Sequence, residues 1–299
     1  MTSIVILGSL ELGIIYAILA LGVFISFRTL NMPDLTVDGS FTLGAAVSVV
    51  MSLSGHPFLG LFLAFSAGGG AGCITALLHT KLEIQPLLAG ILTMLALYSI
   101  NLKVMSGRAN IALLNKSTVF SLIENLVSGD YARLILAAVI LIVVLILLFL
   151  FLNTRLGFVL RATGDNDQMV RSLGVNTDFV ILIGLALSNG LVALSGALIA
   201  QDQSFVDVGM GIGMVIIGLA SVIIGEVVFG TKTLFRRLIA VILGSILYRL
   251  IIAFALELGM PPTDLKLVSA VIVALALSTP VLRKRFNFMR RKLIHPNQQ

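Results

Sequence analysis

The sequence of 299 residues has no tryptophan, one cysteine and few charged residues, which make up 11% of the chain. A single cysteine excludes a disulfide framework and any zinc site built on cysteine ligands. Soluble domains have about 25% charged and about 45–50% apolar residues, whereas the apolar share here is 58%. The composition therefore speaks against a water-soluble globule, and it also excludes a disordered chain.

The net charge of +6 would also suit a nucleic-acid-binding protein. In a chain this apolar, the excess of Lys and Arg is better interpreted as membrane topology, because cytoplasmic loops of membrane proteins collect these residues. We expect no nucleic-acid partner. The basic tail is expected to contact anionic lipid headgroups instead.

Long apolar runs dominate the chain, and each is much longer than a strand. A transmembrane barrel would need alternating segments of about ten residues, and the sequence shows none. The first run, Ile4 to Phe27, lacks a basic leader and a clear cleavage site, so we expect a span rather than a removable signal peptide. We predict an all-α, polytopic transmembrane bundle of about nine spans (eight to ten), at roughly 3–27, 39–53, 58–79, 84–106, 131–152, 178–200, 210–229, 238–257 and 266–282.

The second segment is short and follows a polar stretch in which Pro33 and Gly39 flank Asp34 and Asp38. Such a stretch is either a loop or the broken start of a helix that lines a cavity. Irregular backbone at membrane depth persists only where protein or water covers it. The two aspartates are candidate gate or cavity residues, and simple helix capping is the alternative.

Basic residues set the expected orientation. The segment 283–299 carries six Lys or Arg and no acid, so we predict a transmembrane domain over 1–282 followed by a basic cytoplasmic tail. Alternation then places the loops 153–177 and 230–237 in the cytoplasm. Most of the 20 basic residues fall on that side, and the N-terminus is expected outside.

Two long hydrophilic connections remain. The outer one, 107–130, contains an amphipathic stretch over 119–127 that we expect to lie along the outer surface. The inner one, 153–177, predicts a short helix that begins at Asp165, Asn166 or Asp167 and ends at Gly174. Its apolar face comprises Met169, Val170 and Leu173. Either a soluble partner or the membrane surface must cover that face.

Polar residues inside the spans need a physical reason, because a charge there costs about 2.5–3.5 kcal/mol. Arg249 would line a cavity and meet a carboxylate, or it would pair with Glu226 or Asp38. Asn189 and Asn101 are expected to hydrogen-bond across helices. Asn189, Glu226 and Arg249 join the two aspartates as candidate cavity or gate residues. Glycines spaced three and four apart in 68–72 and 209–213 predict close helix contacts.

Four stretches together resemble the permeases of ABC importers, in the subgroup of branched-chain amino acid and ribose-type permeases. The inner loop matches their coupling-helix region, with Thr154-Arg-Leu-Gly157, Gly164-Asp-Asn166 and Arg171-Ser-Leu-Gly-Val175. The other three, in the same order as in the family, are Pro33-Asp-Leu-Thr-Val-Asp-Gly-Ser40, Gln85-Pro-Leu-Leu-Ala-Gly-Ile-Leu-Thr-Met94 and Gly213-Met-Val-Ile-Ile-Gly-Leu-Ala-Ser221.

Two departures bear on the solute. Asp38 stands where sugar-type members have glycine, and Glu226 stands where relatives commonly carry a Gly-Gly pair. The chain is therefore similar to a less-studied branch thought to handle amino acids, aromatic or branched-chain, more than sugars or nucleosides.

The resemblance implies a type II ABC importer-like membrane subunit in a bacterial cytoplasmic membrane. It would work as a pair, expected to be a homodimer although the family permits heterodimers, with two ATP-binding subunits and an extracytoplasmic substrate-binding protein. The chain has no Gly-x-x-x-x-Gly-Lys-[Ser/Thr] loop, so we expect no cofactor of its own and ATP hydrolysis on the partner. The implied coupling residues are Gly164, Asp165, Asn166, Asp167, Met169, Val170, Arg171, Leu173 and Gly174.

One alternative class stays open. In a secondary transporter driven by an ion gradient, Arg249, Asp38 and Glu226 would form a charge relay.

Overall fold

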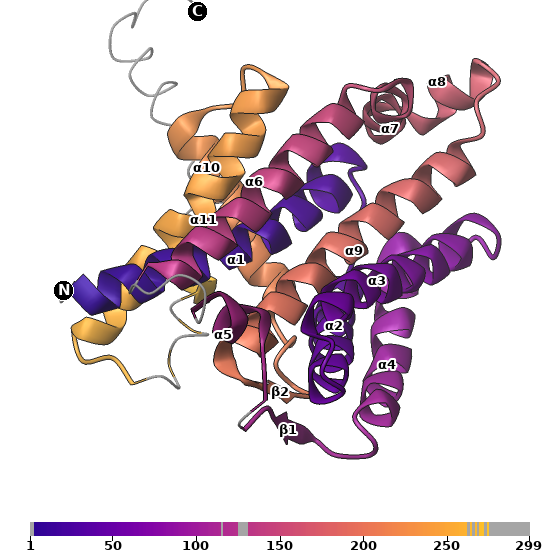
Figure 1. Cartoon of the computed structure of the whole chain (residues 1–299). Coiled ribbons are helices and arrows are strands. Elements are labelled where there is room, and N and C mark those ends of the chain that lie inside the picture. The colour runs from indigo at the N-terminus through magenta and orange to yellow at the C-terminus, as the bar shows by residue number, and fades with distance from the viewer. Residues whose placement is uncertain are drawn as a thin grey trace, which may run out of the picture.

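Helices form almost all of the structure, a computed structural model that describes residues 3–114, 116–124 and 131–261, and beyond these only 264, 267, 269–271 and 274 (Figure 1). Seven helical segments are long and apolar enough to cross a membrane. They are α1 (Ser3–Val23) continued by the π-helix η1 (Phe24–Thr29), α2 (Thr36–Leu53), α3 (Pro57–Thr80), α4 (Pro86–Val104), α6 (Ala132–Leu152), α9 (Thr177–Gln203) and α11 (Leu234–Glu257). The predicted helical membrane bundle is confirmed.

Two of the predicted spans are not among these seven helices. The segment 210–229 contains turns followed by α10 (Met214–Phe229), a helix of 16 residues. Its N-terminal part is irregular because Gly213 adopts a positive φ of 91°, a conformation that ends a continuous helix. The predicted span 266–282 and the tail 283–299 lie outside the described residues, apart from a few positions up to 274.

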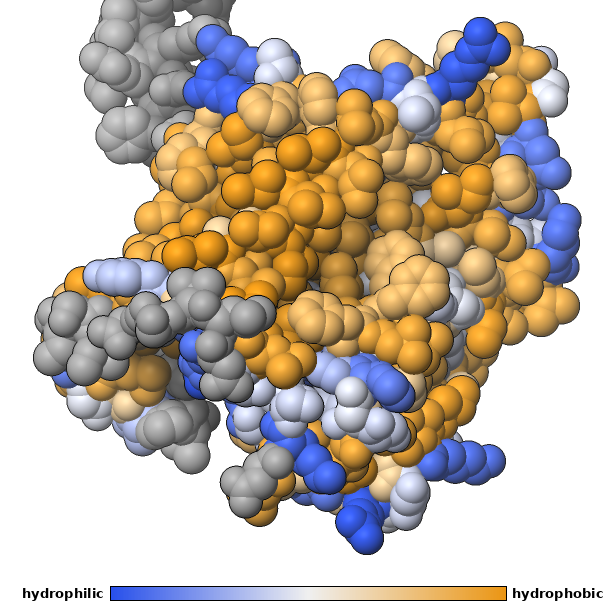
Figure 2. Space-filling view, viewed as in Figure 1, coloured by the Kyte–Doolittle hydropathy of each residue, from blue (hydrophilic) through white to orange (hydrophobic). Residues whose placement is uncertain are grey.

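The core forms around α2 and α9. α9 packs against α1, α2 and α3, and most of its side chains are buried. By contrast, α4 and α6 leave most of their apolar side chains exposed, as expected for helices that face lipid. Figure 2 shows the result as a broad apolar belt, with hydrophilic side chains gathered towards the two ends of the molecule.

The small residues of α3 bring it close to α9, as the glycine spacing predicts. A Cβ at Gly68 would meet the side chain of Ala193, and one at Gly72 would overlap the carbonyl oxygen of Leu185. Because these two glycines are one helical turn apart, they form a shallow groove in which the α9 backbone lies.

A small β-ribbon accompanies the helices of this all-α bundle. β1 (Asn110–Ala112) pairs with β2 (Phe205–Asp207) in an antiparallel sheet, with Ile111 opposite Val206. Both strands belong to long connections that emerge at the same end of the bundle (Figure 1). Their backbone groups would otherwise lack partners where Val206 is fully buried.

The outer amphipathic stretch is also placed differently from the prediction. It forms the short helix α5 (Val119–Glu124), whose residues Val119 and Phe120 are buried against the protein rather than spread along the membrane surface. The Val119 amide donates a hydrogen bond to Gln201 Oε1 on α9 at 2.7 Å, which fixes the start of this helix. Residues 125–127 lie outside the described part.

The α3–α9 contact gives a direct test of packing. Gly72→Ala should lower the free energy of unfolding in detergent by about 1–3 kcal/mol, because the added methyl overlaps backbone that has little room to move. Circular dichroism during thermal unfolding measures this effect. Gly70→Ala is the matched control, since a Cβ there meets nothing within 4 Å. Equal melting of both variants would contradict the proposed contact.

Candidate translocation and coupling site

The first break in the bundle lies between the end of η1 at Thr29 and the start of α2 at Thr36. Asn31 has a positive φ of 54°, which turns the chain sharply after the π-helix. The prediction of a broken element over 31–39 is thus confirmed for its first half, whereas Asp38 and Gly39 already belong to α2. Asp34 lies in this break and is only 1% exposed.

Neutral donors surround the buried carboxylate of Asp34. Its Oδ1 accepts a hydrogen bond from the Thr36 amide at 2.9 Å, and its Oδ2 accepts one from Asn189 Nδ2 on α9 at 2.7 Å. Ser40 Oγ donates to Asn189 Oδ1 at 2.8 Å. Burial raises the pKa of the Asp34 carboxyl, and the hydrogen bonds from Thr36 and Asn189 oppose that rise. Asp34 and Asn189 therefore fasten the break to the central helix.

A row of threonine hydroxyls extends this polar network across two more helices. Thr36 Oγ1 lies 2.7 Å from Thr75 Oγ1 on α3, which in turn donates to Thr93 Oγ1 on α4 at 3.0 Å. All three side chains are buried. The start of α2 is consequently connected by side-chain hydrogen bonds to α3, α4 and α9.

Asp38 stabilises the second break of the bundle. Its Oδ2 accepts a hydrogen bond from the Gly213 amide and its Oδ1 accepts one from the Val215 amide, both at 2.9 Å. Thr42 Oγ1 accepts another from the Gly211 amide at 3.1 Å. Asp38 therefore caps a helix, which was one of the two interpretations. The helix that it caps is α10, whereas Asp38 itself belongs to α2.

A small cavity of about 160 Å³ adjoins Asp38 and is also lined by Thr42, Tyr98 and Asn101. Asn101 is 1% exposed and donates to the Gly39 carbonyl at 3.2 Å, but its Oδ1 has no hydrogen-bond partner among the described residues. Sequence reasoning gave Asn101 only a structural role and did not consider Tyr98 or Thr42. The signal was present: Tyr98 and Asn101 are three residues apart and share one face of a span.

The inner loop forms two consecutive helices, α7 (Arg155–Asp165) and α8 (Asp167–Ser172). Asn166 is the N-cap of α8, with its Oδ1 accepting from the Met169 amide at 3.0 Å. Gly174 follows the helix end with a φ of 79°. Both positions agree with the predicted short helix and its caps.

The apolar face predicted for this helix is divided. Val170 is 4% exposed and faces the protein, whereas Met169 and Leu173 are 61% and 71% exposed. Since Met169 and Leu173 are four residues apart, they form one exposed apolar patch on α8. Val170 instead packs against the protein on the other side of α8.

Ion pairs hold α8 against the bundle. Arg171 Nη2 lies 2.9 Å from Asp178 Oδ1 in the first turn of α9, and its Nε lies 3.2 Å from Asp167. Lys81, at the end of α3, lies 3.1 Å from the other oxygen of Asp178. Sequence reasoning did not identify Asp178 or Lys81 as part of this region, because their partners are distant in the chain.

Gly164 brings α7 into contact with the first break. A Cβ at this position would overlap the Thr29 carbonyl oxygen and lie 2.9 Å from Leu30 Cα. Leu30 also lies against Gly184 of α9. Helix α7 therefore rests directly on the segment that leads to Asp34, and α8 follows it in the chain.

The ion pairs suggested for Arg249 do not form among the described residues. Glu226 instead accepts hydrogen bonds from Arg28 at the end of η1. The Arg249 guanidinium lies over the Tyr16 ring, 4.2 Å from its centroid, and its buried Nε has no hydrogen-bond partner. Arg28 and Glu226 meet because η1 and α10 end at the same side of the bundle, a neighbourhood that sequence spacing does not reveal.

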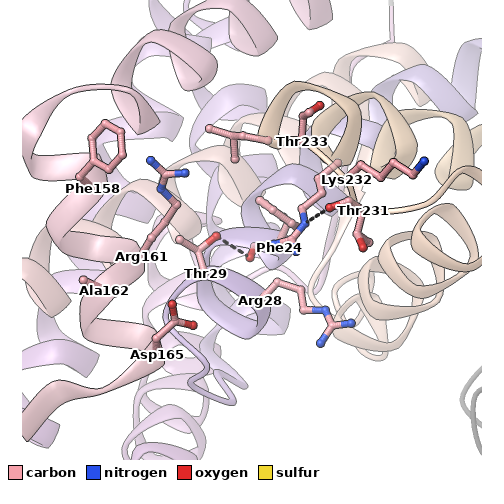
Figure 3. A pocket seen from close by; sticks show the side chains of 12 residues that line it. Phe24, Arg28, Thr29, Phe158, Arg161, Ala162, Asp165, Thr231, Lys232 and Thr233 are labelled. Atoms are coloured by element: carbon pink, nitrogen blue, oxygen red, sulfur yellow. Dashed lines mark hydrogen bonds between the residues drawn. The ribbon is translucent and has the colours of Figure 1, made fainter.

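A cleft of about 470 Å³ opens beside this ion pair, between η1, α7 and the start of α11. In Figure 3, Arg161 and Asp165 of α7 lie on one side and Thr231, Lys232 and Thr233 on the other. The basic side chains of this cleft come from η1 and from the two predicted inner loops: Arg28, Arg161, Lys232 and Arg237. This arrangement confirms that these loops lie together at one end of the structure.

Comparisons with known proteins agree with this architecture. Residues 5–277 match the model of the family described as "Branched-chain amino acid transport system / permease component". The chain is 41% identical to the tyrosine transport system permease protein of Clostridioides difficile over 97% of its own length and 96% of the relative's. It is 27% identical to the galactofuranose transporter permease protein YtfT of Escherichia coli, over 87% and 75% of the two chains.

An uncharacterized protein of Rickettsia prowazekii, RP368, is 34% identical over 92% of this chain and 97% of its own. No solved structure matches the chain. The family match spans all seven long apolar helices and both breaks between them. The chain is a multi-pass membrane protein, and it belongs to the ABC-type permeases of the branched-chain amino acid transport family.

Proposed function

We propose that this chain is the membrane subunit of an ATP-driven importer that moves a small polar solute, an amino acid, by alternating access. One observation carries the proposal: α7, which leads directly into the exposed helix α8, contacts the start of the break that holds Asp34, through Gly164. In this proposal two ATP-binding subunits dock on α8, two copies of the chain form the path, and a substrate-binding protein delivers the solute.

The contacts define how force would travel. A partner that binds Met169 and Leu173 moves α8, which Arg171 connects to the start of α9. The same movement reaches Thr29 and Leu30 through α7. Because Asp34 links this segment to Asn189 of α9, the break and the central helix shift together. The coupling role of residues 164–174 is a proposal that these contacts support.

The cavity beside Asp38 supports an amino-acid solute. Asn101 presents a buried, unpartnered Oδ1, which an N–H donor of the solute would satisfy. Tyr98 forms part of the same lining and offers an aromatic surface. A relative 41% identical to the chain carries the name of a tyrosine transport permease. We infer that the solute is an amino acid, with aromatic ones the first to test.

The three residues of the alternative charge relay have separate contacts: Glu226 with Arg28, Arg249 with Tyr16, and Asp38 with the start of α10. This arrangement favours an ATP-driven cycle over an ion-driven one. The test is uptake of labelled tyrosine into proteoliposomes that contain the chain and its co-purified partners. Uptake should require ATP and persist with a protonophore, and loss of uptake with the protonophore would overturn the proposal.

Exposed apolar side chains on α8 should determine docking of the ATP-binding subunit. The double substitution Met169→Ser with Leu173→Ser should reduce the amount of co-purified ATP-binding subunit about 30-fold, since apolar anchors at an interface contribute about 2 kcal/mol or more. Leu114→Ser, at a site 82% exposed near the β-ribbon, is the control and should leave this amount unchanged. Full retention of the partner by the double variant would show that α8 is not the docking site.

Close packing at Gly164 should be required for coupling. Gly164→Ala should lower ATP-dependent uptake about tenfold while the ATP-binding subunit still co-purifies, because the methyl separates α7 from Thr29. Gly70→Ala makes the same chemical change in open space and should transport normally. Normal uptake by the Gly164 variant, at normal membrane levels, would rule out this transmission path.

The unpartnered oxygen of Asn101 gives a test of solute binding. Asn101→Leu keeps the approximate size of the side chain and removes the acceptor, together with the hydrogen bond to the Gly39 carbonyl, so the KM for uptake should rise about tenfold with little change in kcat. Asn153→Leu, at an exposed helix end, serves as the control. An unchanged KM would remove the cavity from the solute path.

A further inference from the structure

The basic cleft between η1, α7 and the start of α11 has no role in the proposed path of the solute. Its volume of about 470 Å³ lies within the range of about 300–1,000 Å³ that is usual for ligand sites. Cationic side chains enter it from three separate segments: Arg28, Arg161, and the pair Lys232 and Arg237. In Figure 3, Arg161 and Asp165 lie on the α7 side of the cleft, Lys232 lies across from them, and Arg28 lies between.

The charges of the lining leave a cationic excess. Among the residues that line the cleft, Asp165 is the acid, and Arg28 forms an ion pair with Glu226 beside the cleft. Arg161 lies over the Phe158 ring at 4.4 Å and donates to the Leu152 carbonyl, while its buried Nε has no hydrogen-bond partner in the part of the chain that the structure describes. Lys232 has no ion pair with any residue that the structure describes. Two acids thus face four cations, and an anion would balance them.

The depth of the cleft indicates where such an anion comes from. Arg28 lies at the end of the first membrane span, which ends at Thr29, and Arg237 lies in the first turn of the span that begins at Leu234. Headgroup phosphates are found at this level, just outside the hydrocarbon core. The Phe158 side chain is 59% exposed and provides an apolar wall beside the cations.

The start of α11 contributes a further attraction. Thr233 is its N-cap and the helix is 24 residues long, so the positive end of its dipole faces the cleft together with Lys232. Arg237 Nε donates to the Thr231 carbonyl at 3.0 Å, which holds its guanidinium against the loop. The site is thus built from charge, helix end and aromatic surface at one membrane level.

We propose that this cleft binds the phosphate of an anionic phospholipid headgroup. The bound lipid would connect η1, α7 and α11 at the side where α7 meets the first break. The proposal concerns a lipid site and does not depend on the transported solute or on the energy source. Its failure would therefore leave the proposed transport function untouched.

The test uses the full-length chain, purified in neutral detergent and stripped of lipid. Native mass spectrometry measures the binding of phosphatidylglycerol and of phosphatidylcholine with identical acyl chains. The wild-type chain should prefer phosphatidylglycerol about tenfold. Arg237→Gln should abolish most of this preference. Arg236→Gln, the matched control, should keep it, because Arg236 precedes Arg237 and donates to the Phe229 carbonyl, but lies outside the cleft.

Lys232→Gln provides a second variant, in which an exposed side chain changes without loss of a described contact, and it should lower the preference about threefold. Two results would overturn the proposal. The first is equal binding of both lipids by the wild type. The second is an equal effect of the Arg236 and Arg237 variants together with no effect of the Lys232 variant. Inorganic phosphate at millimolar concentration should not displace the lipid. Displacement would replace the lipid with a free phosphate as the ligand and would also overturn it.

Discussion

Backbone groups that are buried away from water need hydrogen-bond partners within the protein, so each irregular stretch between packed helices must be satisfied there. This chain has two such breaks, at 30–35 and at 204–213, and an aspartate of the same short stretch serves each of them. Asp34 binds the amide of Thr36 and connects the first break to Asn189 of α9. Asp38 binds the amides at the start of α10 and completes the second. The central arrangement of α2, α9 and α10 depends on these two carboxylates.

The same breaks give the bundle places where it can change shape. A continuous helix moves as one rod, whereas an irregular segment held by side chains has alternative ways to satisfy its groups. Of the two exposed helices α7 and α8, α7 rests on the first of these segments through Gly164. The ion pairs of Asp178 connect them to α3 and α9. In the proposed cycle, movement at the exposed end of the structure would reach its buried polar centre through these few contacts.

The candidate site illustrates which residues a sequence reveals. Asn166 and Gly174 were predicted as the ends of a short helix, because caps act on backbone a few residues away. Asp34, Asp38 and Asn189 were recognised as polar residues at membrane depth, but their partners were not. The partner of Asp38 is about 175 residues away, and Arg28 took the place expected for Arg249 beside Glu226. Long-range pairing depends on how helices are arranged, and local patterns carry no information about it.

The sequence by itself determined that this protein lies in a membrane and where most of its helices end. Apolar runs of about 20 residues have one stable form in lipid, and glycine, proline and capping residues mark where it stops. The tertiary structure decided the β-ribbon, the shortened α10, the division of the α8 face and the basic cleft. Each of these arises where segments distant in the chain meet, because unsatisfied backbone groups and charges take their partners from whatever the packed helices bring within reach.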